Sequence, residues 1–160
     1  KSDFKLSMAV DEDSIFGETV AVLKLRDAGR RCVQELWSRY YRHSAVQSLY
    51  TSPSAVFDSV DHFWISRKHR SMTVHYKRST PLYHLCVSPE PHAKVRERGN
   101  GLHSSDGHQA SFLFGQSGVC RVKCFDAECQ RQLDCPMLGR ALFKLPSELC
   151  EQGMHALNAA

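Results

Sequence analysis

The sequence predicts an α+β fold, with a mixed sheet and a helix in the first half and a small β-hairpin module in the second. Residues 4–10 alternate between apolar and polar side chains, as a half-buried strand does. Residues 19–40 instead repeat apolar side chains every three or four positions, as an amphipathic helix does. After Pro81 the chain becomes rich in Pro, Gly, Ser and charged residues. We therefore expect an α+β body at residues 1–80 and a smaller module at residues 81–160.

The remaining elements follow from short apolar runs that turn-forming residues separate. The run Gly-Gln-Ser-Gly at residues 115–118 is typical of the turn in a hairpin. In chain order we expect a turn-rich loop at 48–59, strands at 63–65 and 72–76, a long loop at 87–107, strands at 111–114 and 119–122, and a short apolar tail at 136–150.

Length and composition limit the functions open to the chain. Its 160 residues fit a single domain, or a small domain with an added module. A content of 42% hydrophobic and 24% charged residues is ordinary for a globular protein and excludes a collagen, a coiled coil or a wholly disordered chain. No apolar run approaches the roughly 18 residues that a membrane helix needs. We therefore expect no membrane partner.

The charge is unevenly distributed along a chain whose net charge is +4. Residues 1–20 contain five acidic side chains, whereas residues 62–98 contain eight Lys or Arg and two Glu. A basic segment of this kind is either a solvated face or a surface for a polyanion such as single-stranded DNA or RNA. The acidic segment is a candidate cation site.

The seven cysteines are an odd number, and four of them fall between residues 120 and 135. A secreted disulfide scaffold usually has an even number and follows a secretion signal, which does not open this sequence. Metal binding by reduced thiols explains the cluster better. We therefore expect an intracellular protein of the nucleus or mitochondrion that is not secreted.

Zinc is the metal that this cysteine spacing favours. Cys124 and Cys129 are separated by four residues and can place both sulfurs on one tetrahedral ion. Two further ligands are needed, and a module this small is expected to depend on the ion for its fold. The candidates for these ligands are His84, Cys86, His92, His103 and His108, and the rival ligand set is Cys120, Cys124, Cys129 and Cys135.

The second half resembles the C-terminal zinc module of PrimPol-type primase-polymerases, a group that includes the herpesvirus primase subunit. Cys-x4-Cys with an acidic filler is followed about fifteen residues later by Phe-Lys-Leu-Pro at 143–146, where the family has Phe-Pro-Leu-Pro. His103 stands where the family has a His before the hairpin. The family's first Cys is missing at its usual place, and Cys86 can replace it across a longer loop. The resemblance thus implies a zinc site of Cys86, His103, Cys124 and Cys129.

The first half resembles the catalytic motifs of the same family. An apolar strand runs into Asp11 and Asp13, which stand two residues apart like the family's Asp-x-Glu. The resemblance implies that these two acids are catalytic and bind Mg²⁺ or Mn²⁺ with a nucleotide triphosphate. Another alignment places Ala9 and Asp11 at the acid positions and breaks the metal pair. The remaining interpretation of residues 11–13 is an acidic turn before the helix.

Residues 65–74 resemble the family's second motif, which grips phosphate groups. Thr73 stands where the family has a His, and a Thr cannot carry positive charge. The same stretch also resembles the third motif, but chain order favours the second. The resemblance, together with the charge pattern, implies phosphate or nucleic-acid binding by Arg67, Lys68, Arg70, Ser71, Lys77 and Arg78.

Three functions follow from these patterns. The first is a DNA primase or primase-polymerase, or part of one, acting with other protein subunits. The second is a catalytically inactive relative that binds RNA or DNA as a structural subunit of a large ribonucleoprotein or replisome. The third is a zinc-stabilised protein-interaction module, in which Trp37, Phe63, Trp64 and Tyr76 contribute to a partner surface.

Overall fold

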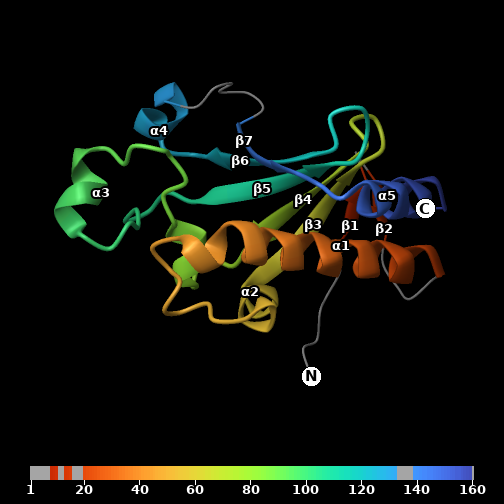
Figure 1. Cartoon of the computed structure of the whole chain (residues 1–160), viewed down its shortest axis with the longest axis horizontal. Helices are drawn as coiled ribbons and strands as arrows, with labels where there is room; N and C mark the ends of the chain where they lie inside the picture. Colours follow the sequence, from red (N-terminus) through yellow and green to blue (C-terminus); the bar gives the residue numbers. More distant parts are fainter. Residues whose placement is uncertain (1–7, 11–12, 16–19, 133–138, 160) are drawn as a thin grey trace.

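The fold is α+β, as expected from the sequence. The computed structural model describes residues 8–10, 13–15, 20–132 and 139–159. A single sheet forms one layer, and helices α1 (Val20–Arg39) and α5 (Ser147–Ala159) lie against each other on one of its faces (Figure 1). The hydrophobic core lies between these helices and the sheet.

The sheet has seven strands in the order β2-β1-β3-β4-β5-β6-β7. Among the described strands, only β1 and β3 pair in parallel, and the strands from β3 to β7 form a continuous antiparallel sheet. Because β4 pairs with β5, the sheet continues across residue 80, where the sequence predicts a boundary between body and module. The strands are β1 (Met8–Val10), β2 (Asp13–Ile15), β3 (Val60–Ser66), β4 (Ser71–Tyr76), β5 (His108–Leu113), β6 (Val119–Cys124) and β7 (Arg140–Lys144).

Helix α1 forms where the apolar spacing predicts it. Its fully buried residues include Leu25, Ala28, Cys32 and Leu36, which recur every three or four positions on the face toward the sheet. Gly29 lies on the same side, where an added Cβ would stand 3.1 Å from the Phe63 ring. The glycine therefore lets the helix approach the sheet closely.

Three helices and one strand lie at least partly in segments expected to be loops or tail. In α2 (Pro53–Asp58), Ser52 accepts a hydrogen bond from the Ala55 amide, and Pro53 occupies the first helical turn. This cap, rather than a long apolar repeat, sets α2, so periodicity alone does not reveal it. The others are α3 (Ala93–Arg98) and α5, together with the edge strand β7. Helix α4 (Ala127–Gln132) follows the β5–β6 hairpin, where the sequence analysis assigns no element.

Of the two candidate catalytic acids, the structure describes only Asp13, which does not continue the strand that precedes it. Strand β1 ends at Val10, and Asp13 begins β2, which runs antiparallel to β1 with Asp13 opposite Val10. Asp11 lies outside the described residues. Asp is disfavoured in strands and favours turns, so an acidic run is where a strand tends to end. Asp13 therefore belongs to β2 and not to the end of β1, where the sequence predicts it.

Candidate metal centre and basic sheet face

The end of β6 brings two cysteines close together. Cys124 is the last residue of β6, and Cys129 lies in α4 after a short turn. The Asp126 carboxylate makes this turn, because its Oδ1 accepts hydrogen bonds from the amides of Glu128 (2.9 Å) and Cys129 (3.1 Å). The acidic residue between the cysteines thus has a structural role at the start of α4.

Two strand-like segments bring the other pair of predicted ligands to the same place. Leu85 and Leu102 form an isolated antiparallel bridge. On either side of it, the Cys86 amide donates to Gly101 O (2.9 Å) and the His103 amide donates to the carbonyl of the residue before Leu85 (2.8 Å). The bridge therefore fixes Cys86 and His103 side by side across a long loop.

The four predicted ligands form one buried cluster. Cys86 Sγ lies 3.5 Å from Cys129 Sγ. His103 Nε2 lies 3.4 Å from Cys124 Sγ and 3.5 Å from Cys129 Sγ. Adjacent ligand atoms on a tetrahedral zinc ion, with bonds of about 2.0–2.3 Å, stand about 3.5–3.8 Å apart. The arrangement therefore has the dimensions of a site that could hold one metal ion.

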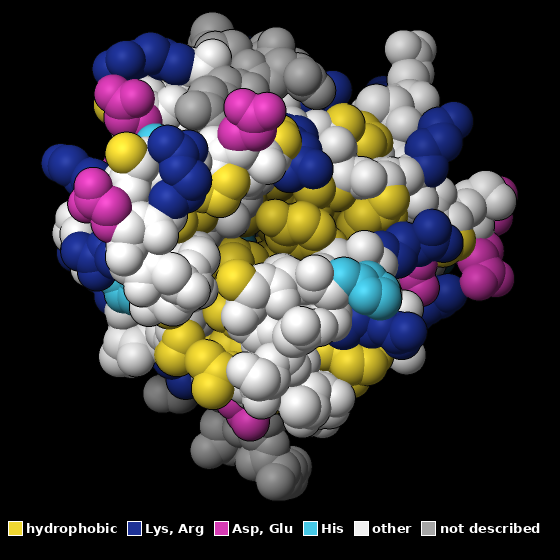
Figure 2. Space-filling model, turned by 60° about the vertical axis from the view of Figure 1, so that its left-hand side comes forward, with side chains coloured by type: hydrophobic (Ala, Val, Ile, Leu, Met, Phe, Trp, Pro, Cys, Tyr) yellow, Lys and Arg dark blue, Asp and Glu magenta, His cyan; other side chains and the backbone are white. Residues whose placement is uncertain are grey.

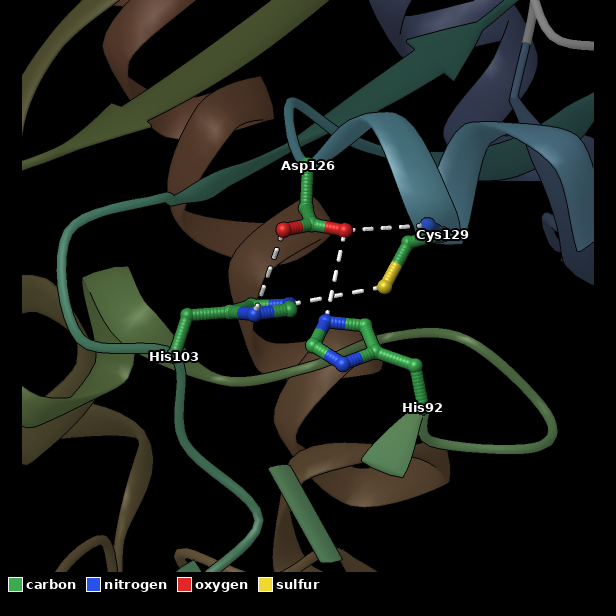
Figure 3. A group of neighbouring side chains, drawn as sticks. All are labelled: His92, His103, Asp126 and Cys129. Atoms are coloured by element: carbon green, nitrogen blue, oxygen red, sulfur yellow. Dashed lines mark hydrogen bonds and ion pairs between the residues drawn. The ribbon is translucent and has the colours of Figure 1, made fainter. Parts of the chain in front are cut away.

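A second donor set overlaps the first. One donor atom each from His92, His103, Asp126 and Cys129 can be chosen so that all lie within 4.8 Å of one another (Figure 3). His92 Nε2 stands 3.3 Å from Asp126 Oδ1, and His103 Nδ1 stands 4.0 Å from Asp126 Oδ2. His103 thus directs Nε2 to the thiols and Nδ1 toward a carboxylate, as metal-binding histidines do, although the separation of 4.0 Å is longer than a hydrogen bond.

Burial makes this cluster unfavourable for charged thiols in the absence of a cation. Burial raises the pKa of Cys124 to about 11, and it raises the pKa of Cys129 well above its usual value. Burial also lowers the pKa of His103, although the Asp126 carboxylate opposes this effect. A bound divalent cation would stabilise the thiolate and neutral imidazole forms that coordinate metals.

The remaining candidate ligands are directed elsewhere. Cys120 precedes Cys124 by four residues of β6, or about 13 Å, too far for both sulfurs to bind one ion. Cys135 lies outside the described residues. His108 Nε2 contacts the Tyr41 hydroxyl at 2.8 Å, and both ring nitrogens of His84 face backbone carbonyls. The rival four-cysteine set is therefore not brought together.

The predicted basic patch is split between the two ends of β4. Arg67, Lys68 and Arg70 lie in the turn between β3 and β4, and Ser71 is the first residue of β4. Lys77 and Arg78 follow the other end of this six-residue strand, about 20 Å away. There Arg78 donates to the Tyr83 hydroxyl at 3.3 Å. The six residues therefore do not form one surface.

A different basic surface lies on the sheet face opposite α1. It is a hollow of about 210 Å³ whose lining contains no carboxylate among the described residues. Sequence reasoning missed most of the lining, although the alternation of basic and apolar residues in β6 indicates a strand with a basic face. The lining residues are His69, Ser71, Gln109, Ser111, Leu113, Arg121 and Lys123.

An aromatic residue lies beside this hollow. Trp64 pairs with Thr73, and Thr73 pairs with Ser111, across β3, β4 and β5. Trp64 is 41% exposed, and the Thr73 and Ser111 hydroxyl oxygens are 2.8 Å apart. By contrast, Phe63 and Tyr76 are buried, so of the aromatics predicted for a surface Trp64 is the most accessible.

The end of the molecule that carries α3 and α4 has a different surface. Figure 2 shows hydrophobic side chains across the middle of this view and Lys or Arg side chains interspersed with Asp and Glu around them. Basic charge is therefore not separated from acidic charge here, unlike in the hollow of the sheet face.

None of the helices that the structure describes combines the length and apolar character required to cross a membrane.

Comparison with known proteins leaves the family open. No protein-family model matches the chain, and no curated protein or solved structure is significantly similar to it.

Proposed function

We propose that this chain is a zinc-containing, PrimPol-like protein that binds single-stranded DNA or RNA on the open face of its sheet. The observation that carries the proposal is the hollow with Arg121, Lys123 and hydroxyl groups but no carboxylate in its lining. Positive charge without nearby negative charge favours a polyanion, because phosphate contacts supply most of the affinity for nucleic acid.

The neighbouring aromatic residue favours a single strand over a duplex. Bases of a single strand are free to stack on an exposed ring, and such stacking contributes about 1–3 kcal/mol per base. Trp64 and Arg121 belong to the same row across β3 to β6, separated by three strand spacings or about 14 Å. A strand lying along this row can stack on Trp64 while its phosphates contact the basic residues of β6.

Zinc in this proposal holds the basic face in place. The ion would be bound by Cys86, His103, Cys124 and Cys129, and three pairs of their donor atoms stand 3.4–3.5 Å apart, which supports this ligand set. Cys124 directly follows Lys123, and alternation directs these two side chains to opposite faces of the sheet. The metal would therefore anchor the end of the strand that presents the basic residues.

The proposal is tested by fluorescence anisotropy with labelled single-stranded DNA, single-stranded RNA and duplex DNA over a range of salt. We expect Arg121→Gln with Lys123→Gln to weaken single-strand binding at least tenfold and to reduce the salt dependence by about 1.4 log units per log unit. We expect Trp64→Ala to weaken binding about 5- to 100-fold with little change in salt dependence.

The matched control is Lys94→Gln with Arg98→Gln on α3, which removes the same charge away from the sheet face. Equal losses for the two double variants would show that net charge alone acts and would contradict the proposed surface. Absence of binding to every oligonucleotide would contradict the function itself.

Primer synthesis is the second candidate function, and one observation favours it. Ser71, which the resemblance assigns to phosphate binding, lines the same hollow. Synthesis of primers on single-stranded DNA with Mg²⁺ or Mn²⁺, lost in Asp11→Ala and Asp13→Ala, would support an active primase. Binding without synthesis would favour an inactive relative that serves as a subunit of a larger assembly.

We propose a nuclear or mitochondrial location, because the clustered thiols suit a reducing compartment.

A further inference from the structure

Two histidines stack on the open face of the sheet, beside the hollow. His62 and His75 pair across β3 and β4, and their ring centroids lie 4.4 Å apart with the planes inclined by only 7°. His62 stands two residues from Trp64 in β3 and so projects from the same face. Cross-strand neighbours have Cβ atoms about 4.5–5.5 Å apart, so the stack runs across the strands rather than along them. The outer face of His75 is therefore turned toward the next strand, β5.

The next two residues of this row carry polar groups. Gln109 of β5 pairs with His75, and Lys123 of β6 pairs with Gln109. Both Gln109 and Lys123 line the hollow. A planar group stacked on the outer face of His75 would lie above Gln109 and have Lys123 at its far side. An amide can donate to and accept from the edge of a base, and an ammonium group can contact a phosphate.

Charge gives this row a direction. At one end the Asp61 carboxylate accepts a hydrogen bond of 2.8 Å from His62 Nδ1. Lys123 lies at the other end, three strand spacings or about 14 Å from His62. A phosphate is therefore favoured beside Lys123 and disfavoured beside Asp61, which leaves an uncharged base for the histidine rings.

The distance between this row and the row of Trp64 suits an unpaired strand. The two rows are two residues apart along β3, or about 7 Å. Consecutive charges of one strand in a duplex are only about 3.4 Å apart along the helix axis. Neighbouring bases that occupy both rows must therefore separate from each other, which a single strand allows and a duplex does not.

We propose that His62, His75, Gln109 and Lys123 form a second nucleotide subsite next to the row of Trp64. A base stacks on His75, Gln109 forms a hydrogen bond with its edge, and Lys123 contacts the adjoining phosphate. His62 supports the His75 ring on the side away from the base. The inference rests on the proposed single-strand binding, and it deepens that function by assigning a second base and the direction of its nucleotide.

The test compares a labelled single-stranded DNA with an abasic strand of the same length, which keeps the phosphates and lacks the bases. Fluorescence anisotropy measures the affinity of the full chain for each. We expect His75→Ala to bind the base-bearing strand about 5- to 100-fold more weakly than the wild type does, and the abasic strand equally well. His75→Phe keeps an aromatic face, so its affinity for both strands should stay within threefold of the wild type. Lys123→Gln should instead weaken binding of both strands, because both retain phosphates.

The matched control is His155→Ala, which removes an exposed histidine from α5 on the other face of the sheet and should change neither affinity. Unchanged affinity of His75→Ala for the base-bearing strand would mean that no base stacks there. Equal weakening of both strands by His75→Ala would mean that this ring only maintains the sheet. Either result would overturn the subsite and leave the proposed function standing, whereas failure of the wild type to bind any oligonucleotide would overturn both.

Discussion

The two ends of the sheet give opposite outcomes for sites implied by the same resemblance. At the β6 end, Cys86, His103, Cys124 and Cys129 come from distant segments and converge to within 3.5 Å of a neighbour. At the β1–β2 end, Asp13 begins β2 opposite Val10, the last residue of β1, and Asp11 lies outside the described residues.

The difference teaches which sequence arguments transfer to structure. Ligand chemistry identifies candidates for a thiol cluster without requiring a particular strand register, because Cys and His are the usual ligands of zinc wherever the chain brings them together. A paired-carboxylate argument depends on where the strand ends, and a shift of a single residue reverses which face a side chain occupies. The metal end therefore rests on firmer inference than the acidic end.

The largest expected effect comes from removing a thiol at the metal end. Structural zinc contributes about 10–16 kcal/mol of binding free energy to small domains. We expect Cys129→Ser to lose its bound metal and at least about 5 kcal/mol of unfolding free energy, or to fail to fold. Thermal unfolding by circular dichroism, with metal content measured in parallel, checks this.

Cys120→Ala is the matched control, because Cys120 is equally buried on the same strand and lies outside the cluster. This variant should keep its metal, and its free energy of unfolding should fall by only about 1 kcal/mol. Equal destabilisation of the two variants, with metal retained in both, would place Cys129 among ordinary core residues and remove the contrast between the ends.

Sequence reasoning succeeded for the long and strongly patterned elements of the fold. It predicted α1, strands β3 to β6 in outline, and the four thiol-cluster residues. It missed β7 and α5, because an edge strand and a short helix in residues 139–159 depend on packing against β6 and α1. It also missed Asp126, whose carboxylate acts through the backbone of its own turn, which residue spacing does not reveal.

The dependence of stability on pH gives a second test of this comparison. At low pH the buried His108 at the start of β5 disfavours the folded state. Burial lowers the pKa of His108 to about 4 from an ordinary value of 6.5. As pH falls, the unfolded chain therefore takes up this proton first, so stability present above pH 6.5 is lost down to about pH 4. The loss should reach about 3 kcal/mol, measured by denaturant unfolding at several pH values.

The substitution His108→Gln separates the effect of His108 on stability from the effect of metal loss at low pH. The substitution removes the titrating ring while leaving a polar group near the Tyr41 hydroxyl, 2.8 Å from His108 Nε2. We expect the variant to be less stable at neutral pH and to show a shallower loss of stability between pH 6.5 and 4. Parallel pH profiles for variant and wild type would assign the whole acid sensitivity to the metal cluster.

A smaller effect should follow from changing the charge behind the metal ligand. Asp126→Asn keeps an oxygen that can accept the Glu128 and Cys129 amides, but it removes the negative charge facing His103. We expect affinity of the metal-free chain for Co²⁺, measured by titration of the thiolate-to-cobalt absorption band, to fall about 10- to 100-fold. Glu128→Gln is the control, since it removes an exposed carboxylate of the same turn and should change affinity less than threefold. Equal effects would show that charge near the turn acts without orienting His103.

The smallest effect is expected at the acidic end, and it decides whether the two ends act independently. Asp13→Asn and Asp11→Asn should each change the free energy of unfolding by no more than about 0.5 kcal/mol. They should leave metal content and single-strand affinity unchanged, because the acidic end pairs with β3 while the proposed metal and basic sites lie toward β6. Thermal unfolding, elemental analysis and anisotropy on the same preparations measure all three. Loss of a bound ion in either variant would instead couple the ends, since the acids would then hold metal in the resting protein. The sheet would in that case be one extended site rather than two, and primer synthesis would become the favoured function.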